Sequence, residues 1–339
     1  MIPFLLAILI SVVVVIITMP LARRIGLLAF PGEHRIHSDP IPLVGGPAIF
    51  LAVWGGWLFT GQSIPLGLFT ASVLVFIFGM LDDKWNLPYF VRFMVQITAI
   101  LILVYIDGMR LWQLGGLVSE EFVQLGRYSL ALTIFAAVGV INAVNMIDGI
   151  DGLAAGLVIV CLAGLSLILN ISGQWDPFPV LVIGALLGFM VFNFRVVSAR
   201  PAKIFLGDSG STLLGLWVAW LLITHTQTYD SVLKPAYALW LLFIPLFDTV
   251  GVMLRRMIHR KSPFKADRTH THHYLQALGL NNKAVTLVLI VIGLMAACLA
   301  LMAIRFGIPE HITFFAFLTI FAVYLIFIER LFPAKNYSE

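Results

Sequence analysis

Charged residues are scarce in this chain of 339 residues, where Asp, Glu, Lys and Arg together make up 11%. Ordinary soluble domains carry roughly 25% charged residues. Hydrophobic residues make up 60% of the chain, and the mean hydropathy is +1.01. This balance argues against an ordinary soluble protein and indicates that most of the chain lies in lipid.

Cysteine is also nearly absent. The two cysteines, Cys161 and Cys298, stand far apart in the middle of apolar runs, and neither belongs to a C-x-x-C motif or a Cys/His cluster. Structural zinc sites and redox motifs need such clusters. We therefore interpret both cysteines as packing residues and expect no metal or redox role for them.

Apolar runs recur along the whole chain, and a membrane-spanning helix needs about 20 such residues. The first run, from Pro3 to Leu21, has no basic residue before it and no small-residue cleavage signature after it, so we expect a spanning helix rather than a removed signal peptide. The runs predict an all-α polytopic membrane protein of about eleven transmembrane helices, forming a single domain over residues 1–339. The expected spans are 3–22, 44–61, 64–81, 90–106, 129–147, 153–171, 178–195, 210–224, 235–256, 284–304 and 312–331.

The basic residues predict the orientation, because cytoplasmic loops are enriched in Lys and Arg. With a periplasmic N-terminus, only Arg110, Arg127, Lys234 and Arg305 lie outside, and all other Lys and Arg residues lie inside. The loops at 23–43, 82–89, 148–152, 196–209 and 257–283 are then cytoplasmic, as is the C-terminus, in a multi-pass protein of the inner (plasma) membrane. The same bias, together with anionic lipid, explains the pI of about 9.1, so no nucleic-acid partner is expected.

The unusual polar motifs all fall on this cytoplasmic side, which predicts an active-site cleft there. Asp82 and Asp83 follow the third span. Adjacent residues on a helix point about 100° apart, so we expect different roles for the two acids. Magnesium prefers oxygen ligands and uses one or two carboxylates with phosphate and water, which suits scattered aspartates. The alternative is an acidic pair that merely ends a helix in water.

A second polar series follows the fifth span. Asn142, Asn145, Asp148 and Asp151 are spaced by three, so they lie along one face for as long as the helix continues. Two amides and two acids in register within a strongly apolar chain favour a site. The alternative is a polar helix end followed by an ordinary turn.

A third motif precedes the eighth span, where glycines and small hydroxyl residues surround Asp208. Backbone amides at such a helix start can hold phosphate, although the acid could instead be a plain N-cap. Phe205 could stack on a base, or it could anchor the chain at the membrane interface.

The longest cytoplasmic loop carries three histidines, His270, His272 and His273, within a basic run. Three histidines are compatible with zinc, but no fourth ligand or cysteine pair accompanies them. An H-x-H-H segment in a basic loop suits anions equally well, so phosphate or sugar contact is favoured over metal ligation.

Six segments, in this order, resemble the polyprenyl-phosphate N-acetylhexosamine-1-phosphate transferase family, over about residues 20–280. One such segment alone would mean little, whereas six in the family's order are specific. They are P-L-V-G-G at 42–46, G-M-L-D-D at 79–83, N-A-V-N-M-I-D-G-I-D-G-L at 142–153, F-L-G-D-S-G-S at 205–211, P-L-F-D at 245–248 and H-T-H-H at 270–273.

The resemblance implies an all-helical bundle of ten or eleven spans with a cytoplasmic cleft, a requirement for Mg²⁺ or Mn²⁺, and a homodimer. It also implies site residues. Asp208 is similar to the metal ligand, Phe205 to the residue that stacks on uracil, and Asp82 and Asp83 to the pair that handles the lipid phosphate, with Asp151 as a further catalytic residue. The resemblance implies substrate contacts for Asn142, Asn145, Asp148, Asp248, His270, His272, His273 and Arg92, the last at a position where the family often carries Lys.

The resemblance implies transfer of N-acetylglucosamine 1-phosphate from UDP-N-acetylglucosamine to undecaprenyl phosphate in the membrane, with release of UMP and inhibition by tunicamycin. The His270-Thr271-His272-His273 segment is similar to the H-x-H-H of the bacterial N-acetylglucosamine branch. The alternative within the family is phospho-N-acetylmuramoyl-pentapeptide transfer. The alternative from another functional class is a lipid or solute transporter. Transporter sites lie near the bilayer midplane, whereas these acids stand at the ends of spans.

Overall fold

The computed structural model describes residues 1–30, 40–119, 121–194, 202–228, 231–262 and 270–332. Within these ranges the chain is all-α apart from one pair of two-residue antiparallel strands, in which Leu28 faces Pro42 and Ala29 faces Ile41. The elements are α1 (Ile2–Ile25), β1 (Leu28–Ala29), β2 (Ile41–Pro42), α2 (Gly45–Trp57), α3 (Leu66–Trp85), α4 (Tyr89–Ile106), a 3-10 helix (Gly126–Tyr128), α5 (Ser129–Met146), α6 (Leu153–Ile171), α7 (Pro177–Asn193), α8 (Gly207–Thr226), α9 (Pro235–Leu241), α10 (Phe243–Ile258), α11 (Thr271–Ala277), α12 (Asn282–Arg305) and α13 (Glu310–Leu331).

The helices are those of a polytopic membrane protein. Seven described helices are long and apolar enough to cross a bilayer, or eight if the bent pair α9 and α10 forms one span. A helix satisfies its own backbone groups, which is required where no water is available. Every predicted span coincides with a helix or with this bent pair, while the count of eleven and the orientation remain predictions. Six basic residues assigned to the cytoplasmic side, Arg35, Arg195, Arg200, Lys265, Arg268 and Lys335, lie outside the described residues.

The predicted span over 235–256 is not a single straight helix. The chain bends by 87° between α9 and α10. Pro245 lies in the first turn of α10, where it lacks the N–H that would bond to the carbonyl of Leu241 in a continuous helix. The helix therefore ends and restarts at Leu242. A further helix, α11, forms within the histidine segment that we expected to be part of a loop.

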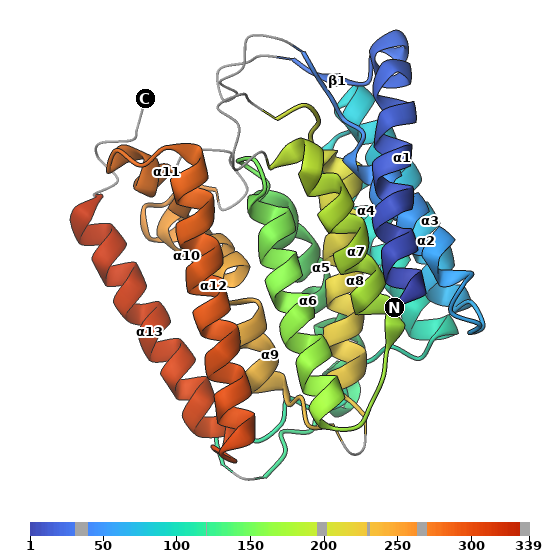
Figure 1. Cartoon of the computed structure of the whole chain (residues 1–339). Coiled ribbons are helices and arrows are strands. Elements are labelled where there is room, and N and C mark those ends of the chain that lie inside the picture. Colours follow the sequence, from blue (N-terminus) through green and yellow to red (C-terminus); the bar gives the residue numbers. More distant parts are fainter. Residues whose placement is uncertain (31–39, 120, 195–201, 229–230, 263–269, 333–339) are drawn as a thin grey trace.

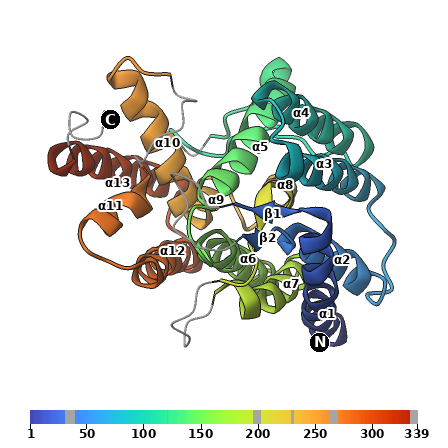
Figure 2. The ribbon, with the colours of Figure 1, turned by 90° about the horizontal axis from the view of Figure 1, so that it is seen from above.

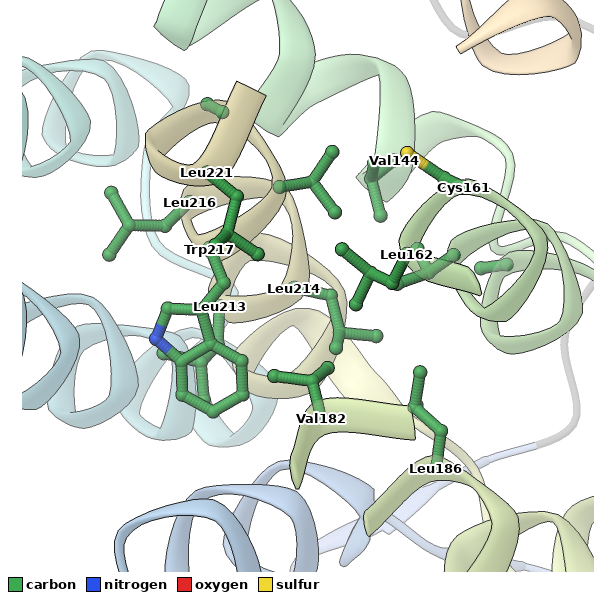
Figure 3. Packing of buried hydrophobic residues seen from close by; sticks show 14 of the residues in the cluster. Val144, Cys161, Leu162, Val182, Leu186, Leu213, Leu214, Leu216, Trp217 and Leu221 are labelled. Carbon is green, nitrogen blue, oxygen red and sulfur yellow. The ribbon is translucent and has the colours of Figure 1, made fainter. Parts of the chain in front are cut away.

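Helix α8 lies at the centre of the bundle. Figure 2 shows α2, α3, α5, α6 and α7 arranged around it. Figure 3 shows Leu213, Leu214 and Trp217 of α8 packed among side chains of α5, α6 and α7. The fully buried Trp217 also donates its indole N–H to Ser72 Oγ of α3 at 2.8 Å. The middle of α8 is thereby packed tightly against its neighbours.

The strand pair and α11 lie at the same end of the bundle, the upper end in Figure 1. At the opposite end the connecting segments are tied down by side chains that accept backbone N–H groups. Asp107 accepts from Gly67 and Leu68 at the start of α3, at 2.9 and 2.7 Å. Glu310 accepts from Gly116 at 2.7 Å. These acids are therefore used for structure.

Candidate active site

The start of α8 is capped by a side chain from another helix. Asp83, in the last turn of α3, accepts the backbone N–H of Asp208 at 2.6 Å, the N–H of Ser209 at 3.1 Å and the Ser209 hydroxyl at 2.6 Å. Gly207 permits this approach with a φ of +74° and no Cβ. The amides of Asp208 and Ser209 are thus already bonded to Asp83. Asp208 itself lies within the first turn and is not the N-cap.

Two motifs recognised in the sequence bring α2 and α3 onto this helix start. A Cβ on Gly79 would lie 2.4 Å from the Cα of Ser209, so only glycine allows α3 to approach so closely. Before α2, the backbone of Pro42–Gly46 pairs with the segment that leads into α8. Phe205 N–H donates to the Pro42 carbonyl at 2.9 Å, and Gly45 N–H donates to the Phe205 carbonyl at 3.1 Å.

Asp208 is oriented by an amide from α5. Asn145 Nδ2 donates to Asp208 Oδ1 at 2.7 Å and to Ser211 Oγ at 2.8 Å. The other carboxylate oxygen of Asp208 lies 4.0 Å from an Arg92 guanidinium nitrogen, and 32% of the Asp208 side chain remains exposed. One oxygen is therefore positioned by protein while the carboxylate stays accessible.

Asp82 has different neighbours from Asp83. Its carboxylate accepts the Leu87 N–H at 2.8 Å and pairs with Arg92 Nε at 2.8 Å, with only 6% of the Asp82 side chain exposed. Arg92 therefore stands between Asp82 and Asp208. The alternative of an acidic pair that simply ends a helix in water is wrong, because both acids are held by specific partners.

A cavity of about 1040 Å³ opens at these residues, between α3, α4, α5, α8 and α10. Its polar lining includes Asp82, Arg92, Asn142, Asn145, Asp208 and His270, all of which we selected from the sequence. The rest is mainly apolar, with side chains such as Val75, Phe78, Val95, Ile134 and Val138. A group of charges therefore adjoins a long apolar surface.

His270 is held at this cavity by a buried acid. Asp248, on α10, accepts from Thr271 N–H at 2.6 Å and lies 2.7 Å from His270 Nδ1. Asp248 has no exposed surface, which explains how a carboxylate within an apolar helix is tolerated: it is paired and hydrogen-bonded.

His272 lies against the turn that follows α5, and His273 lies beside His272. A Cβ on Gly149 would lie 2.6 Å from His272 Nε2, so the ring of His272 packs directly on that turn. His272 is buried, and its ring centre lies 4.2 Å from that of His273. Burial, together with the charge of His273, lowers the pKa of His272 to about 3, so its imidazole is neutral at pH 7.

Asp151 lies in the same turn, and its backbone carbonyl accepts the Thr286 hydroxyl of α12 at 3.0 Å. The structure thus brings the turn of Asp148 and Asp151 next to the histidine segment, although these elements are far apart in sequence. The predicted residues that lie outside the lining of the large cavity are Asp83, Asp148, Asp151, Phe205, Asp248, His272 and His273.

Sequence reasoning missed two amides. Asn193, at the end of α7, accepts the Gly152 N–H at 2.8 Å and donates to the Ile204 carbonyl at 2.9 Å, which joins the turn after α5 to the segment before α8. Gln96, on α4, is buried in the cavity wall and accepts from Asn142. A polar side chain inside an apolar span is itself a signal, and it could have identified Gln96.

The oxygen donors at the cavity suit a hard divalent cation. Asp208 offers an accessible carboxylate, and Mg²⁺ typically takes one or two carboxylates together with substrate phosphates and water. Within the described part of the chain, no group of three or more His, Cys, Asp or Glu side chains is placed to hold a metal ion. An ion held partly by its substrate fits this donor set better than a closed protein cage.

Comparison with known proteins gives a consistent result. The family model for glycosyl transferase family 4 matches residues 65–226, which include Asp82, Asp83 and Asp208. The chain is 33% identical over 324 residues to the undecaprenyl-phosphate α-N-acetylglucosaminyl 1-phosphate transferase of Escherichia coli K12, covering 94% of this chain and 88% of that protein. It is 34% identical to the protein of the same name from Yersinia pestis, covering 91% and 86%. A probable undecaprenyl-phosphate N-acetylglucosaminyl 1-phosphate transferase of Bacillus subtilis is 31% identical, covering 86% and 83%.

Proposed function

The chain belongs to glycosyl transferase family 4, and from this we propose that it transfers N-acetylglucosamine 1-phosphate from UDP-N-acetylglucosamine to undecaprenyl phosphate, releasing UMP. It is a membrane-bound phosphotransferase. We place the reaction at the cytoplasmic face of the inner membrane, as the first membrane step of a cell-surface polysaccharide pathway.

The observation that carries this proposal is the mixed character of the cavity. Asp82, Arg92 and Asp208 stand together at one part of its wall, and apolar side chains of α3, α4 and α5 line the remainder. A water-soluble diphosphate and a lipid-borne phosphate could meet only where charged and apolar surfaces adjoin. The cavity has both.

The acceptor is assigned to the apolar part. A polyprenyl chain is a hydrocarbon, and burial of its surface against Val95, Ile134 and Val138 is favourable. Its phosphate then lies near Arg92, whose guanidinium suits phosphate geometry. A phosphate monoester has a second pKa near 6, so it is already mostly dianionic at pH 7. A general base is therefore less important than neutralisation of charge.

The donor is assigned to the side of the turn after α5. Asp148 and Asp151 on that turn, with His272 and His273 packed beside it, offer hydrogen-bonding groups for a nucleotide-sugar. Phe205 supplies an aromatic face for uracil, and His270, held by Asp248, reaches the cavity where the diphosphate would lie. Asn142 and Asn145 line the space between the two substrates.

Enzymes of this family generally depend on a divalent metal ion. Asp208 would hold it, and we propose Mg²⁺, with Mn²⁺ as a possible substitute. When bound, the ion would neutralise charge on the donor diphosphate. Asn145 fixes the Asp208 carboxylate by its bond to Oδ1, and Asp83 fixes the helix turn that carries it.

The reaction is a phosphoryl transfer in which positioning and charge stabilisation dominate. An oxygen of the acceptor phosphate attacks the phosphorus bound to the sugar. The bond from that phosphorus to the bridging oxygen breaks, and the electron pair leaves with UMP. The product is a polyprenyl diphosphate sugar. Arg92, paired with Asp82, contributes positive charge where these negative groups approach one another.

Two alternatives are tested by the same experiment. The first is transfer of phospho-N-acetylmuramoyl-pentapeptide, and the second is transport, with which the break between α9 and α10 would be compatible. Purified protein in detergent is given undecaprenyl phosphate, Mg²⁺ and radiolabelled UDP-N-acetylglucosamine. We expect label in the lipid extract and an equal amount of UMP. Comparable transfer from the muramoyl-pentapeptide donor would overturn the donor assignment, and no transfer from either would overturn the proposal.

Two further expectations complete the proposal. Tunicamycin, which resembles the nucleotide-sugar and the lipid together, should inhibit competitively with UDP-N-acetylglucosamine.

A homodimer is also expected, and light scattering of the purified protein in detergent would measure its mass.

A further inference from the structure

Gln96 is a buried amide in the wall of the cavity. It lies on α4, four residues after Arg92, so the two side chains project from the same face of the helix about one turn apart. Only 4% of Gln96 is exposed, and both residues line the cavity. Because α4 begins at Tyr89, Gln96 stands farther into the helix than Arg92 and closer to the apolar lining.

The hydrogen bonds of Asn142 determine which end of the Gln96 amide faces the cavity. Asn142 Nδ2 donates to the Val138 carbonyl at 2.8 Å and to Gln96 Oε1 at 2.8 Å. The Val138 carbonyl can only accept, so the nitrogen of Asn142 must lie on that side. Gln96 must then present its oxygen to Asn142. Its NH₂ group, with two donors, is directed away from Asn142.

Among the described residues, the Gln96 NH₂ group donates no hydrogen bond to a protein acceptor. The Gln96 nitrogen keeps a small accessible surface at the cavity wall, so the NH₂ group can reach a ligand there. A ligand in the cavity can therefore supply an acceptor for this group. A phosphate group offers several acceptor oxygens, and a hydrogen bond to a charged group is stronger than one between neutral groups.

The acceptor phosphate is the group that can reach this position. It enters attached to a hydrocarbon chain that occupies the apolar part of the cavity. Gln96 lines the same cavity one helical turn from Arg92. The donor side of the site, by contrast, is formed by the turn after α5 and the histidine segment.

We propose that Gln96 binds the phosphate of the membrane acceptor, donating from the lipid side while Arg92 contacts it from the side of Asp82. The identity of the acceptor rests on the proposed function. The proposal adds Gln96 to the residues that bind the acceptor. It also explains the hydrogen bond between Asn142 and Gln96, which orients the NH₂ group toward the ligand.

Two substitutions separate this role from a merely structural one. Gln96→Glu keeps an oxygen that accepts from Asn142 but replaces the NH₂ donors by a negative charge. Gln96→Leu removes both groups. If Gln96 only supported Asn142, the Glu variant would resemble the wild type. If Gln96 binds phosphate, we expect the KM for undecaprenyl phosphate to rise by roughly 10- to 100-fold in the Leu variant and by more in the Glu variant. The KM for UDP-N-acetylglucosamine should stay within about twofold.

A binding measurement accompanies the kinetics. Undecaprenyl phosphate should raise the melting temperature of the wild type more than undecaprenol does, and the Glu variant should lose this difference. Thr98→Ala, which removes an exposed hydroxyl from the same helix, is the matched control and should behave as the wild type. A wild-type KM for the acceptor in the Glu variant, or equal rises in both KM values, would overturn the inference. A wild type that binds the lipid phosphate without transferring sugar phosphate would overturn the proposed function instead.

Discussion

Asp208 differs from the neighbouring acids in how much of its carboxylate is available. Asp82 is almost fully covered and paired with Arg92, and both oxygens of Asp83 accept hydrogen bonds from α8. About a third of the Asp208 side chain remains exposed, with one oxygen held by Asn145. Three similar residues therefore have three different environments, and only Asp208 combines a fixed orientation with access from the cavity.

For Asp208→Asn we expect loss of at least about 100-fold in metal-dependent kcat with little change in melting temperature, since an amide is a poorer ligand than a carboxylate for a hard cation. Initial rates over a Mg²⁺ titration would measure the effect. Asp82→Asn should also be severe, because it leaves Arg92 without its partner. Near wild-type activity of the Asp208 variant at low Mg²⁺ would remove this residue from the metal site.

The pKa of His272 predicts a pH dependence of stability. Its pKa is about 3 in the folded protein and about 6.5 when the residue is free, so the unfolded chain binds the extra proton between these values. The contribution of His272 to the free energy of unfolding is therefore fully present above about pH 6.5. It decreases as the pH falls toward 3, by at most about 1.4 kcal/mol per pH unit. His272→Gln should show a shallower fall of the melting temperature between pH 7 and pH 5. Identical slopes would contradict the neutral, buried state.

At the level of elements, the central feature is a helix whose first turn is capped by another helix. Asp83 of α3 takes the place of an N-cap residue for α8, and Gly79, one turn earlier in α3, allows the close contact. The position of Asp208 therefore depends on the packing of α3 against α8. This arrangement gives Asp83 a positioning role that does not require contact with substrate.

We therefore expect Asp83→Ala to lower both activity and the melting temperature, because removal of an N-cap costs about 0.5–2 kcal/mol and the first turn of α8 would fray. Asp83→Asn, which retains one acceptor oxygen, should lie between Asp83→Ala and the wild type in both respects. Differential scanning fluorimetry beside activity assays provides the comparison, with Asp208→Asn as the control that loses activity alone. If Asp83→Ala instead kept its full melting temperature while losing activity, a direct role in catalysis would be favoured.

At the level of the whole molecule, the two ends of the bundle differ. The end with the strand pair and α11 carries the charged residues Asp82, Arg92 and Asp208, whereas acids at the opposite end, such as Asp107 and Glu310, accept backbone N–H groups. We therefore expect the chemistry on one side of the membrane. The distribution of Lys and Arg predicts that this side faces the cytoplasm.

Single cysteines in a Cys161→Ala, Cys298→Ala background would test that orientation in intact cells. Trp85, at the end of α3, and Val118, in the segment between α4 and α5, are both well exposed, at 62% and 72%. A membrane-impermeant maleimide should label Val118→Cys and should label Trp85→Cys only after the membrane is opened. Strong labelling of Trp85→Cys from outside would reverse the orientation.

The sequence by itself determined the class of protein, the placement of nearly every helix and the set of acids, amides and histidines to examine. These properties are local, because a run of about 20 apolar residues and a polar residue at its end are visible without knowledge of the fold. The ordered motifs were equally visible, and the residues from Asp82 to Asp208 lie within the segment that the family model matches.

Only the tertiary structure decided which of these residues meet. In lipid, buried and lipid-facing helix surfaces are similarly apolar, so hydrophobic patterning does not reveal which face of α4 turns toward α5. That packing places Gln96 against Asn142, just as the packing of α3 on α8 makes Asp83 a cap rather than a free acid. The bend before α10 likewise brings Asp248 to His270 across 22 positions of sequence. Each contact joins remote segments, and its geometry depends on how whole helices pack.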